Sequence, residues 1–151
     1  MDGMHWEIVA ALLLGLVLIT AAGIALCRRY RRHGRMRSLD EMEGLDFEYY
    51  CADLLAARGF IDVEVTKGSG DYGIDILAEK EGVTYAIQCK RYSGPVGVKA
   101  VQEAYAGRDF YDRMVGCVLT NQYFTQPAVE AAARLKILLW DRDYLESMEE
   151  E

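Results

Sequence analysis

The chain has 151 residues and a formal net charge of −7, a length that suits one modest domain and an appendage. Residues 38–151 carry 11 Lys and Arg against 22 Asp and Glu, so this acidic part is unsuited to binding nucleic acid over its whole surface. The four Cys, at positions 27, 51, 89 and 117, show no C-x-x-C spacing, and with only two His the sequence argues against a zinc site. Cys51, Cys89 and Cys117 lie within apolar patterns, and we expect them to be buried thiols in a reducing compartment.

The first predicted element is a transmembrane helix from Ile8 to Cys27, a run of twenty residues without a charge. A helix of this length spans about 30 Å, the thickness of a hydrocarbon core. Six Arg follow within residues 28–37, and this excess predicts a single-pass anchor in the inner (plasma) membrane, with residues 1–7 outside and the remainder cytoplasmic. A cleaved signal peptide is the alternative, but it would have its positive charge before the apolar run. Ala11 and Gly15 have the spacing of helix-dimer motifs, which leaves a homodimer possible.

Residues 28–40 are predicted to form a basic linker, and residues 41–151 a single domain of alternating elements. Asp46 is the predicted N-cap of the first helix, and Thr125 that of a later one. The order of elements predicts a mixed α/β sheet flanked by helices. By residue range, the predicted elements are a helix at 44–59, strands at 61–65, 74–79 and 83–92, a helix at 98–111, a buried strand at 114–121, a helix at 125–136, a strand at 137–140 and a short helix at 141–148.

Three polar side chains interrupt the two strands that flank the predicted turn at Glu81-Gly82. Gln88 and Lys90 share one face of their strand, and antiparallel pairing across the turn would bring Asp75 close to both. Buried Asp and Lys are costly unless they are paired or bind a metal. A carboxylate with an amide oxygen suits Mg²⁺, and a neighbouring Lys stabilises charge that develops on a phosphate. The pattern predicts a site for phosphodiester hydrolysis.

Four motifs of the chain carry a resemblance to a known family: "FEYYCADLLAARGF", "GDYGIDILAE", "YAIQCKRY" and "GPVGVKAVQEAYAG". Together they resemble the Mrr-like restriction endonuclease catalytic domain of the PD-(D/E)xK nuclease superfamily, over residues 42–125. The resemblance implies a restriction-endonuclease-like fold and hydrolysis of DNA that depends on Mg²⁺ or Mn²⁺. Two positions depart from the superfamily pattern. Gln88 replaces the usual Asp or Glu, as it commonly does in Mrr-like members, and Ile74 replaces the Pro.

The resemblance also implies roles for individual side chains. Asp75 would be the metal-binding carboxylate, Gln88 a further metal ligand and Lys90 the catalytic lysine. Glu48, on the first helix, would assist the metal or its water, although acidic residues are also ordinary in the first turn of a helix.

The roles of Asp75 and Lys90 also have plainer alternatives. Three residues are candidates for contact with the substrate. Asp75 could cap a turn, although Asp71 suits that role better. Lys90 and Arg91 could be the exposed end of a strand. The further candidates for placing the substrate are Asp71, Arg91 and Gln102.

Two functions are consistent with the sequence. The first is a membrane-anchored, metal-dependent endonuclease that acts on DNA in restriction or defence. The second is an inactive nuclease fold that serves as a membrane-tethered module for binding nucleic acid or a protein. The neutral Gln88 and the charge of −11 on residues 38–151 favour the second, and the pairing of Asp75 with Lys90 favours the first.

Overall fold

The computed structural model describes residues 12–24, 39–67 and 72–150, and the chain divides into two compact units, Met1–Arg37 and Ser38–Glu151. In the first unit, residues 12–24 form a helix whose Leu, Ile and Val side chains are between 56% and 71% exposed. Across the described ranges, no helix is both long and apolar enough to cross a membrane. The predicted span from Ile8 to Cys27 continues beyond residues 12–24 at both ends, outside the described residues.

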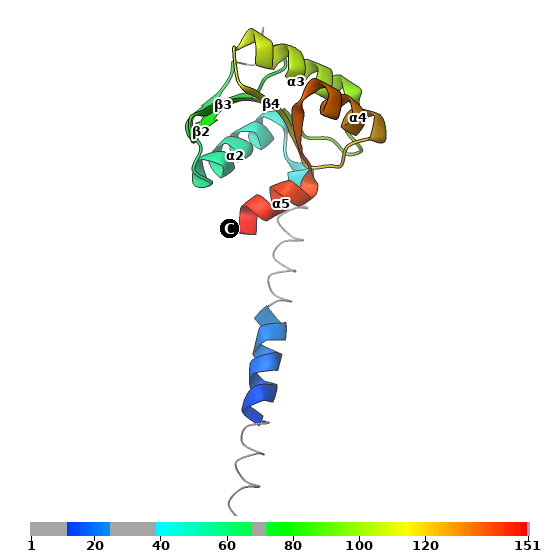
Figure 1. The fold of residues 1–151 in the computed structure, drawn as a ribbon. Coiled ribbons are helices and arrows are strands. Elements are labelled where there is room, and N and C mark those ends of the chain that lie inside the picture. Colours follow the sequence, from blue (N-terminus) through cyan, green and yellow to red (C-terminus); the bar gives the residue numbers. More distant parts are fainter. Residues whose placement is uncertain (1–11, 25–38, 68–71, 151) are drawn as a thin grey trace, which may run out of the picture. The chain divides into compact units, whose positions relative to one another are not determined.

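The helices and strands of the second unit follow the order that the sequence predicts (Figure 1). The strand predicted to begin at Ile74 starts two residues later, and the strand predicted to reach Tyr92 ends at Lys90. In chain order, the elements are α2 (Gly44–Ala57), β1 (Ile61–Val65), β2 (Ile76–Lys80), β3 (Val83–Lys90), α3 (Val98–Phe110), β4 (Val115–Thr120), α4 (Gln126–Leu135), β5 (Ile137–Trp140) and α5 (Arg142–Glu150).

A five-stranded sheet in the order β1-β2-β3-β4-β5 forms the centre of this unit. β1, β2 and β3 pair antiparallel, whereas β3, β4 and β5 pair parallel. The turn between β2 and β3 is Glu81-Gly82, and both residues have positive φ angles, 54° and 78°, as two-residue hairpin turns of the favoured hand require. The prediction of a mixed α/β sheet flanked by helices is therefore confirmed.

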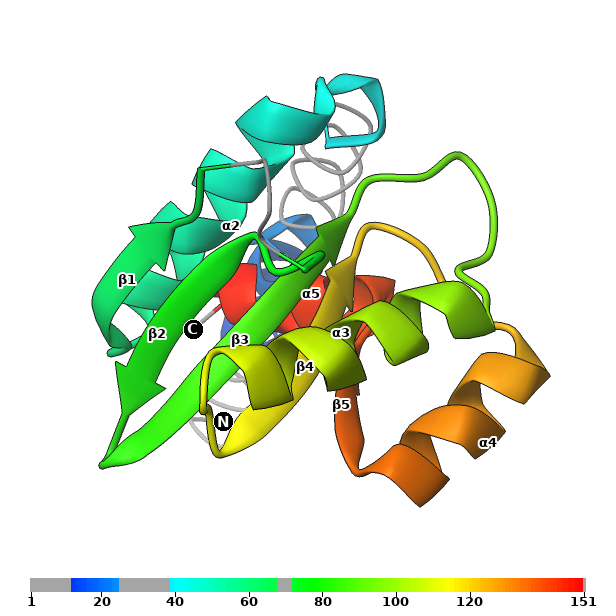
Figure 2. The ribbon, with the colours of Figure 1, turned by 90° about the horizontal axis from the view of Figure 1, so that it is seen from above.

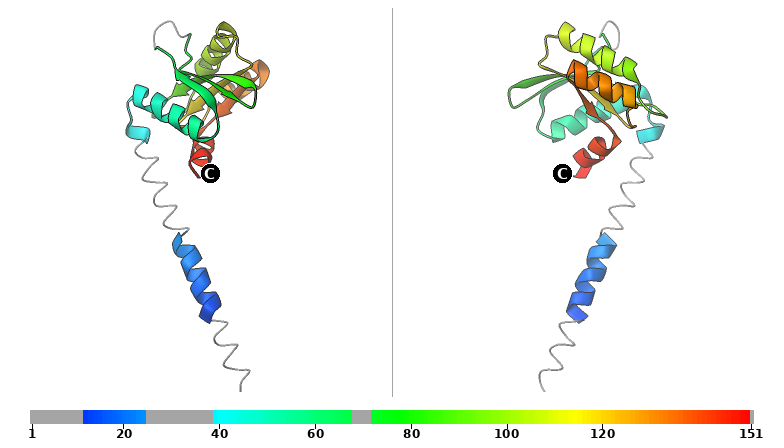
Figure 3. Two further views of the ribbon diagram at one scale, coloured as in Figure 1. Left: turned by 90° about the vertical axis from the view of Figure 1, so that its left-hand side faces the viewer. Right: turned by 45° about the vertical axis from the view of Figure 1, so that its right-hand side comes forward.

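Helices cover both faces of the sheet, with α3 and α4 on one face and α2 and α5 on the other (Figures 2 and 3). α2 buries Phe47, Cys51 and Leu55 because their spacing places them on one side of the helix. α3 approaches the sheet closely at Gly107, where a Cβ would lie 2.3 Å from Cγ1 of Ile74. The fold therefore fixes α3 against the segment that leads into β2.

Local details of the elements confirm some predictions and correct others. Thr125 caps α4, and its side chain accepts a hydrogen bond from the Ala128 amide. Glu43 is the N-cap of α2 in place of the predicted Asp46, which lies in the first turn instead and favours the helix dipole there. β1 is largely exposed, with Ile61 56% exposed, because it is an edge strand of the sheet.

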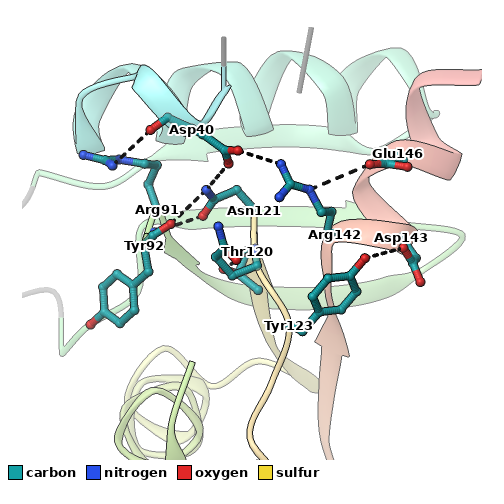
Figure 4. Close-up of polar contacts among 10 residues, drawn as sticks. Asp40, Arg91, Tyr92, Thr120, Asn121, Tyr123, Arg142, Asp143 and Glu146 are labelled. Atoms are coloured by element: carbon teal, nitrogen blue, oxygen red, sulfur yellow. Dashed lines mark hydrogen bonds and ion pairs between the residues drawn. The ribbon is translucent and has the colours of Figure 1, made fainter. Parts of the chain in front are cut away.

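Leu39 and Asp40, which the sequence assigns to the basic linker, are part of the folded domain. Leu39 is fully buried. The carboxylate of Asp40 accepts a hydrogen bond from Nδ2 of Asn121 at 2.7 Å and lies 2.8 Å from Nη2 of Arg142 (Figure 4). Asp40 thus joins the start of the domain to the end of β4 and the start of α5.

Asn121 forms the buried centre of this arrangement. Its Oδ1 accepts a hydrogen bond from the Tyr92 amide at 2.9 Å, and its Nδ2 also donates to the Tyr92 carbonyl at 3.0 Å. Both ends of the amide are therefore occupied. We call Asp40, Tyr92, Asn121 and Arg142 the Asp40 network.

Candidate active site

Asp75 lies directly before β2, at the point where the chain enters the hairpin. Its amide donates to the Ile87 carbonyl at 2.9 Å, and its own carbonyl accepts from the Thr66 amide at 2.9 Å, which ties it to the strands on both sides. Its carboxylate Oδ2 accepts a hydrogen bond from the backbone amide of Cys89 at 2.6 Å. Because Cys89 stands between Gln88 and Lys90, this bond holds Asp75 at the centre of the Gln-x-Lys motif, as antiparallel pairing predicts.

Gln88 and Lys90 turn to the face of the sheet that α3 covers, and both contact Glu103 of that helix. Nε2 of Gln88 donates to Oε2 of Glu103 at 2.7 Å. Nζ of Lys90 lies 3.1 Å from the same oxygen, and Nζ of Lys99 lies 3.6 Å from Oε1. Glu103 therefore binds both polar side chains of the motif through one carboxylate oxygen.

The sequence analysis names Gln102 on this helix and does not identify Glu103. Gln102 is exposed, whereas Glu103 is partly buried beside the sheet. A signal for Glu103 is present in the sequence, because it stands three residues after Ala100 and four before Gly107, both of which are buried. That spacing places Glu103 on the flank of the inward face of α3.

The environment of Glu103 keeps it ionised. Burial alone would raise its pKa, but hydrogen bonds from Gln88 and Lys90 and the positive charges of Lys90 and Lys99 outweigh this effect. The pKa of Glu103 is therefore lowered below its ordinary value.

Gln88 is fully buried, and its amide orientation follows from its contact with Glu103. An ionised carboxylate only accepts hydrogen bonds, so the NH₂ end of Gln88 must face Glu103 and the carbonyl oxygen must face away. Among the residues that the structure describes, this Oε1 is buried and has no hydrogen-bond partner. A buried acceptor without a partner costs about 1–3 kcal/mol, so a ligand for this oxygen would offset a real penalty.

A divalent cation fits the donors that are present here. Hard cations such as Mg²⁺ prefer oxygen ligands and keep several of their waters, so one carboxylate and one amide oxygen are a sufficient protein contribution. Of the residues present, Asp75 would supply the carboxylate and Gln88 the amide oxygen. Within the described ranges, no cluster of three or more His, Cys, Asp or Glu is suited to hold a metal by itself.

Glu48 lies on α2, which covers the other face of the sheet. Cys89 is a buried thiol on β3 that also faces α2, and its pKa reflects the charge of Glu48. A hydrogen bond with Cys51 raises the pKa of Cys89, and burial and the negative charges of Asp75 and Glu48 raise it further. Both carboxylates therefore lie near Cys89, with Glu48 on the side opposite Glu103. Cys51, Cys89 and Cys117 are buried free thiols, as the sequence predicts.

Gly73 fits closely behind the contact between Gln88 and Glu103. Its φ angle is +79°, a conformation that glycine adopts without strain. A Cβ at this position would lie 2.9 Å from Nε2 of Gln88 and 3.1 Å from Cβ of Glu103. Only a residue without a side chain leaves this contact undisturbed.

Two pockets open beside the end of β3. One, of about 370 Å³, is lined by Arg91, Tyr92 and the Ser93–Pro95 segment. The other, of about 110 Å³, includes Lys90 and Glu103 in its lining. Nη1 of Arg91 donates to the Asp40 carbonyl at 3.3 Å, and Nε of Arg91 is buried without a partner among the described residues (Figure 4). Asp71, the remaining substrate candidate, lies outside the described residues.

Solved structures share this fold at low sequence identity. The protein of unknown function AF1548 is 24% identical, with a TM-score of 0.58 over 68% of this chain and 60% of that chain. The DNA modification-dependent restriction endonuclease AspBHI is 16% identical, with a TM-score of 0.62 over 78% of this chain and 34% of that chain. The MspJI restriction endonuclease, solved in complex with a 27-mer oligonucleotide, is 15% identical, with a TM-score of 0.57 over 78% of this chain and 30% of that chain.

The chain thus corresponds to a part of each of these proteins, and no curated protein matches it. The family comparison is more specific. Residues 39–148 match the Mrr_cat family, described as restriction endonuclease, and this range includes Asp75, the Gln-x-Lys motif and Glu103. The chain therefore belongs to the Mrr_cat restriction endonuclease family, with a restriction-endonuclease-like nuclease domain in its second unit.

Proposed function

We propose that the chain is an endonuclease that hydrolyses DNA phosphodiester bonds with the help of a divalent metal ion, in restriction or defence. The observation that carries this proposal is the hydrogen bond from the Cys89 amide to Asp75, because it holds a carboxylate between Gln88 and Lys90. This combination of carboxylate, amide oxygen and ammonium is what metal-assisted attack on a phosphate requires.

Each side chain has a separate task in this proposal. Asp75 and Gln88 would hold Mg²⁺ or Mn²⁺ through their oxygens, and Glu48 would orient water from the α2 side. The ion, when bound, supplies a Lewis acid that polarises the phosphate and lowers the pKa of a bound water. Lys90 stabilises the negative charge that grows on the phosphate oxygens. Arg91 would contact a neighbouring phosphate from its pocket, and Asp71 and Gln102 remain proposed substrate contacts.

Metal-dependent cleavage is the expected result that tests this function. We expect the full-length chain, kept in a mild non-ionic detergent, to nick or cut DNA in the presence of Mg²⁺ or Mn²⁺, and chelation with EDTA to abolish the activity. The substrates should include methylated DNA, because AspBHI is described as modification-dependent. If no form of DNA is cut with either metal, the nuclease proposal fails.

A binding module without catalysis is the alternative. The acidity of residues 38–151 and the neutral amide at position 88 favour it, because an amide is a weaker metal ligand than a carboxylate. The same preparation distinguishes the two functions. Retained binding of DNA, measured by fluorescence anisotropy, with no cleavage at any metal concentration would favour the binding module.

We also propose that residues 8–27 anchor the chain in the inner membrane with the nuclease domain in the cytoplasm. The described part of this segment, residues 12–24, is helical and exposes apolar side chains all around, which is typical of a helix in lipid. The Arg cluster at residues 28–37 supports the orientation, and the spacing of Ala11 and Gly15 supports a dimer through this helix.

The orientation predicts the behaviour of enzyme fusions at the C-terminus. Alkaline phosphatase, which folds only in the periplasm, should be inactive when fused after Glu151, and β-galactosidase at the same position should be active. The reverse pattern would contradict the orientation. Recovery of the full-length chain in the soluble fraction, after lysis without detergent, would contradict the anchor.

A further inference from the structure

Glu103 is a charged residue that the proposed chemistry does not use, yet it contacts two residues that the chemistry needs. Its Oε2 accepts from Gln88 at 2.7 Å and lies 3.1 Å from Nζ of Lys90. Lys90 and Glu103 are both partly buried, with side chains 21% and 31% exposed, so solvent weakens their interaction less than that of an exposed pair.

The contact with Glu103 decides which end of the Gln88 amide is free for a ligand. With the NH₂ group held by a carboxylate that Lys90 and Lys99 also contact, the amide cannot turn round without placing oxygen against oxygen. Oε1 of Gln88 is therefore directed away from Glu103, and it is the end that lacks a partner among the described residues.

The same contact gives a physical reason for an amide at position 88. A Glu at position 88 would put two carboxylates within hydrogen-bond distance of each other in a partly buried place, and like charges so close repel strongly. One member of this pair must therefore be neutral. In this chain the amide stands on the strand and the carboxylate on the helix.

We propose that Glu103 is a positioning residue of the nuclease site, which turns the carbonyl oxygen of Gln88 away from itself, toward the ligand, and holds the ammonium of Lys90 in place. This inference rests on the proposed endonuclease function and goes beyond it, because it assigns a task to a side chain outside the Asp75, Gln88 and Lys90 motif. It also requires that positions 88 and 103 act as a unit, one amide and one carboxylate.

A charge-swap cycle on the full-length chain tests the inference, with wild type, Gln88→Glu, Glu103→Gln and the double variant. Loss of a residue that orients a metal ligand lowers metal affinity or activity about 10- to 100-fold, and we expect this loss in kcat for Glu103→Gln, with little change in KM for DNA. Gln88→Glu should lose about as much, because its two carboxylates repel. The double variant restores one amide and one carboxylate and should regain most of the activity.

Binding of Mn²⁺ without DNA, followed by electron paramagnetic resonance, gives a readout apart from activity. Glu103→Gln should bind Mn²⁺ about tenfold more weakly than wild type. An amide at position 103 both donates and accepts hydrogen bonds, so it allows either orientation of the Gln88 amide. The double variant, with a carboxylate on the strand, should bind at least as tightly as wild type.

A second Gln and Glu pair in the chain provides the matched control. Nε2 of Gln126 lies 3.4 Å from Oε1 of Glu130 on the exposed side of α4. Swapping this pair should leave kcat, KM and Mn²⁺ binding unchanged.

The outcomes separate the inference from the function on which it rests. If wild type and Glu103→Gln cleave DNA and bind Mn²⁺ equally well, or if the double variant is as poor as the two single losses combined, Glu103 has no positioning role. A wild type that neither cleaves DNA nor binds Mn²⁺ would overturn the proposed function itself, and the inference with it.

Discussion

Asp75→Asn and Lys90→Ala should each lower the rate of DNA cleavage at least about a hundredfold, because single electrostatic contributors in active sites are worth roughly 3 to 4 kcal/mol. Asp75→Asn removes the negative charge from the proposed metal ligand. Lys90→Ala removes the positive charge beside the proposed position of the phosphate. Single-turnover cleavage with saturating metal measures the effect on chemistry apart from product release.

The controls for these two variants are exposed residues of similar charge. Asp53→Asn, on the exposed side of α2, and Arg134→Gln, on the exposed side of α4, should keep the wild-type rate. Circular dichroism and the melting temperature show whether each variant remains folded. If folded Asp75→Asn cleaves as fast as wild type, the proposed site is wrong even if the nuclease function is correct.

Asn121→Ala should reduce the free energy of unfolding by about 3 kcal/mol, the largest loss of stability that we expect from one polar substitution in this domain. The change removes three hydrogen bonds and leaves the Tyr92 amide and carbonyl without the side chain that pairs with them. Each such bond contributes about 1 kcal/mol net, and buried groups left unpaired add to the loss. Urea unfolding gives the free energy, and the melting temperature should fall by roughly 10 °C.

Gln122→Ala is the matched control for this effect. Gln122 adjoins Asn121, but both of its hydrogen bonds use backbone atoms. Its backbone N–H donates to Oγ1 of Thr120, and its backbone carbonyl accepts from the Arg142 amide, so the substitution keeps both bonds. Its cost should stay within about 0.5 kcal/mol. Equal losses for the two variants would mean that the Asp40 network does not stabilise the domain.

The fold was largely predictable because its signals are local. The apolar spacing of α2, the Glu81-Gly82 turn and the Thr125 cap are each contained in a few neighbouring residues. The edge position of β1 was not predictable in this way, because the alternation of apolar and polar residues in a strand is the same whether the strand has one neighbour or two. Only the order of the strands places it at the edge of the sheet.

The candidate site was predictable where it depends on pairing across one turn, and not where it depends on tertiary packing. The spacing of Asp75, Gln88 and Lys90 around a hairpin already implies their proximity. The contribution of Glu103 depends on how closely α3 approaches the sheet at Gly107. The spacing of α3 indicates the inward face of that helix but not this approach, and so Glu103 was not identified.

Leu39 and Asp40 were missed for a different reason. They lie just after the Arg-rich residues 28–37, whose composition favours a solvated linker. The partners of Asp40, Asn121 and Arg142, come more than eighty residues later, so no local pattern could reveal them. Where the folded domain begins is therefore decided by contacts at long range.

The Asp40 network has a mechanical consequence if the N-terminal segment is held in a membrane. A pull on the tether reaches the folded domain at Leu39 and Asp40, and from there it passes to Asn121 at the end of β4 and Arg142 in α5. The same force reaches the end of β3 through the contacts of Asp40 with Arg91 and of Asn121 with Tyr92, the two residues that directly follow Lys90. Drag on a domain that holds a long DNA molecule would therefore act on β3, the strand that carries Gln88 and Lys90, as well as on β4 and α5.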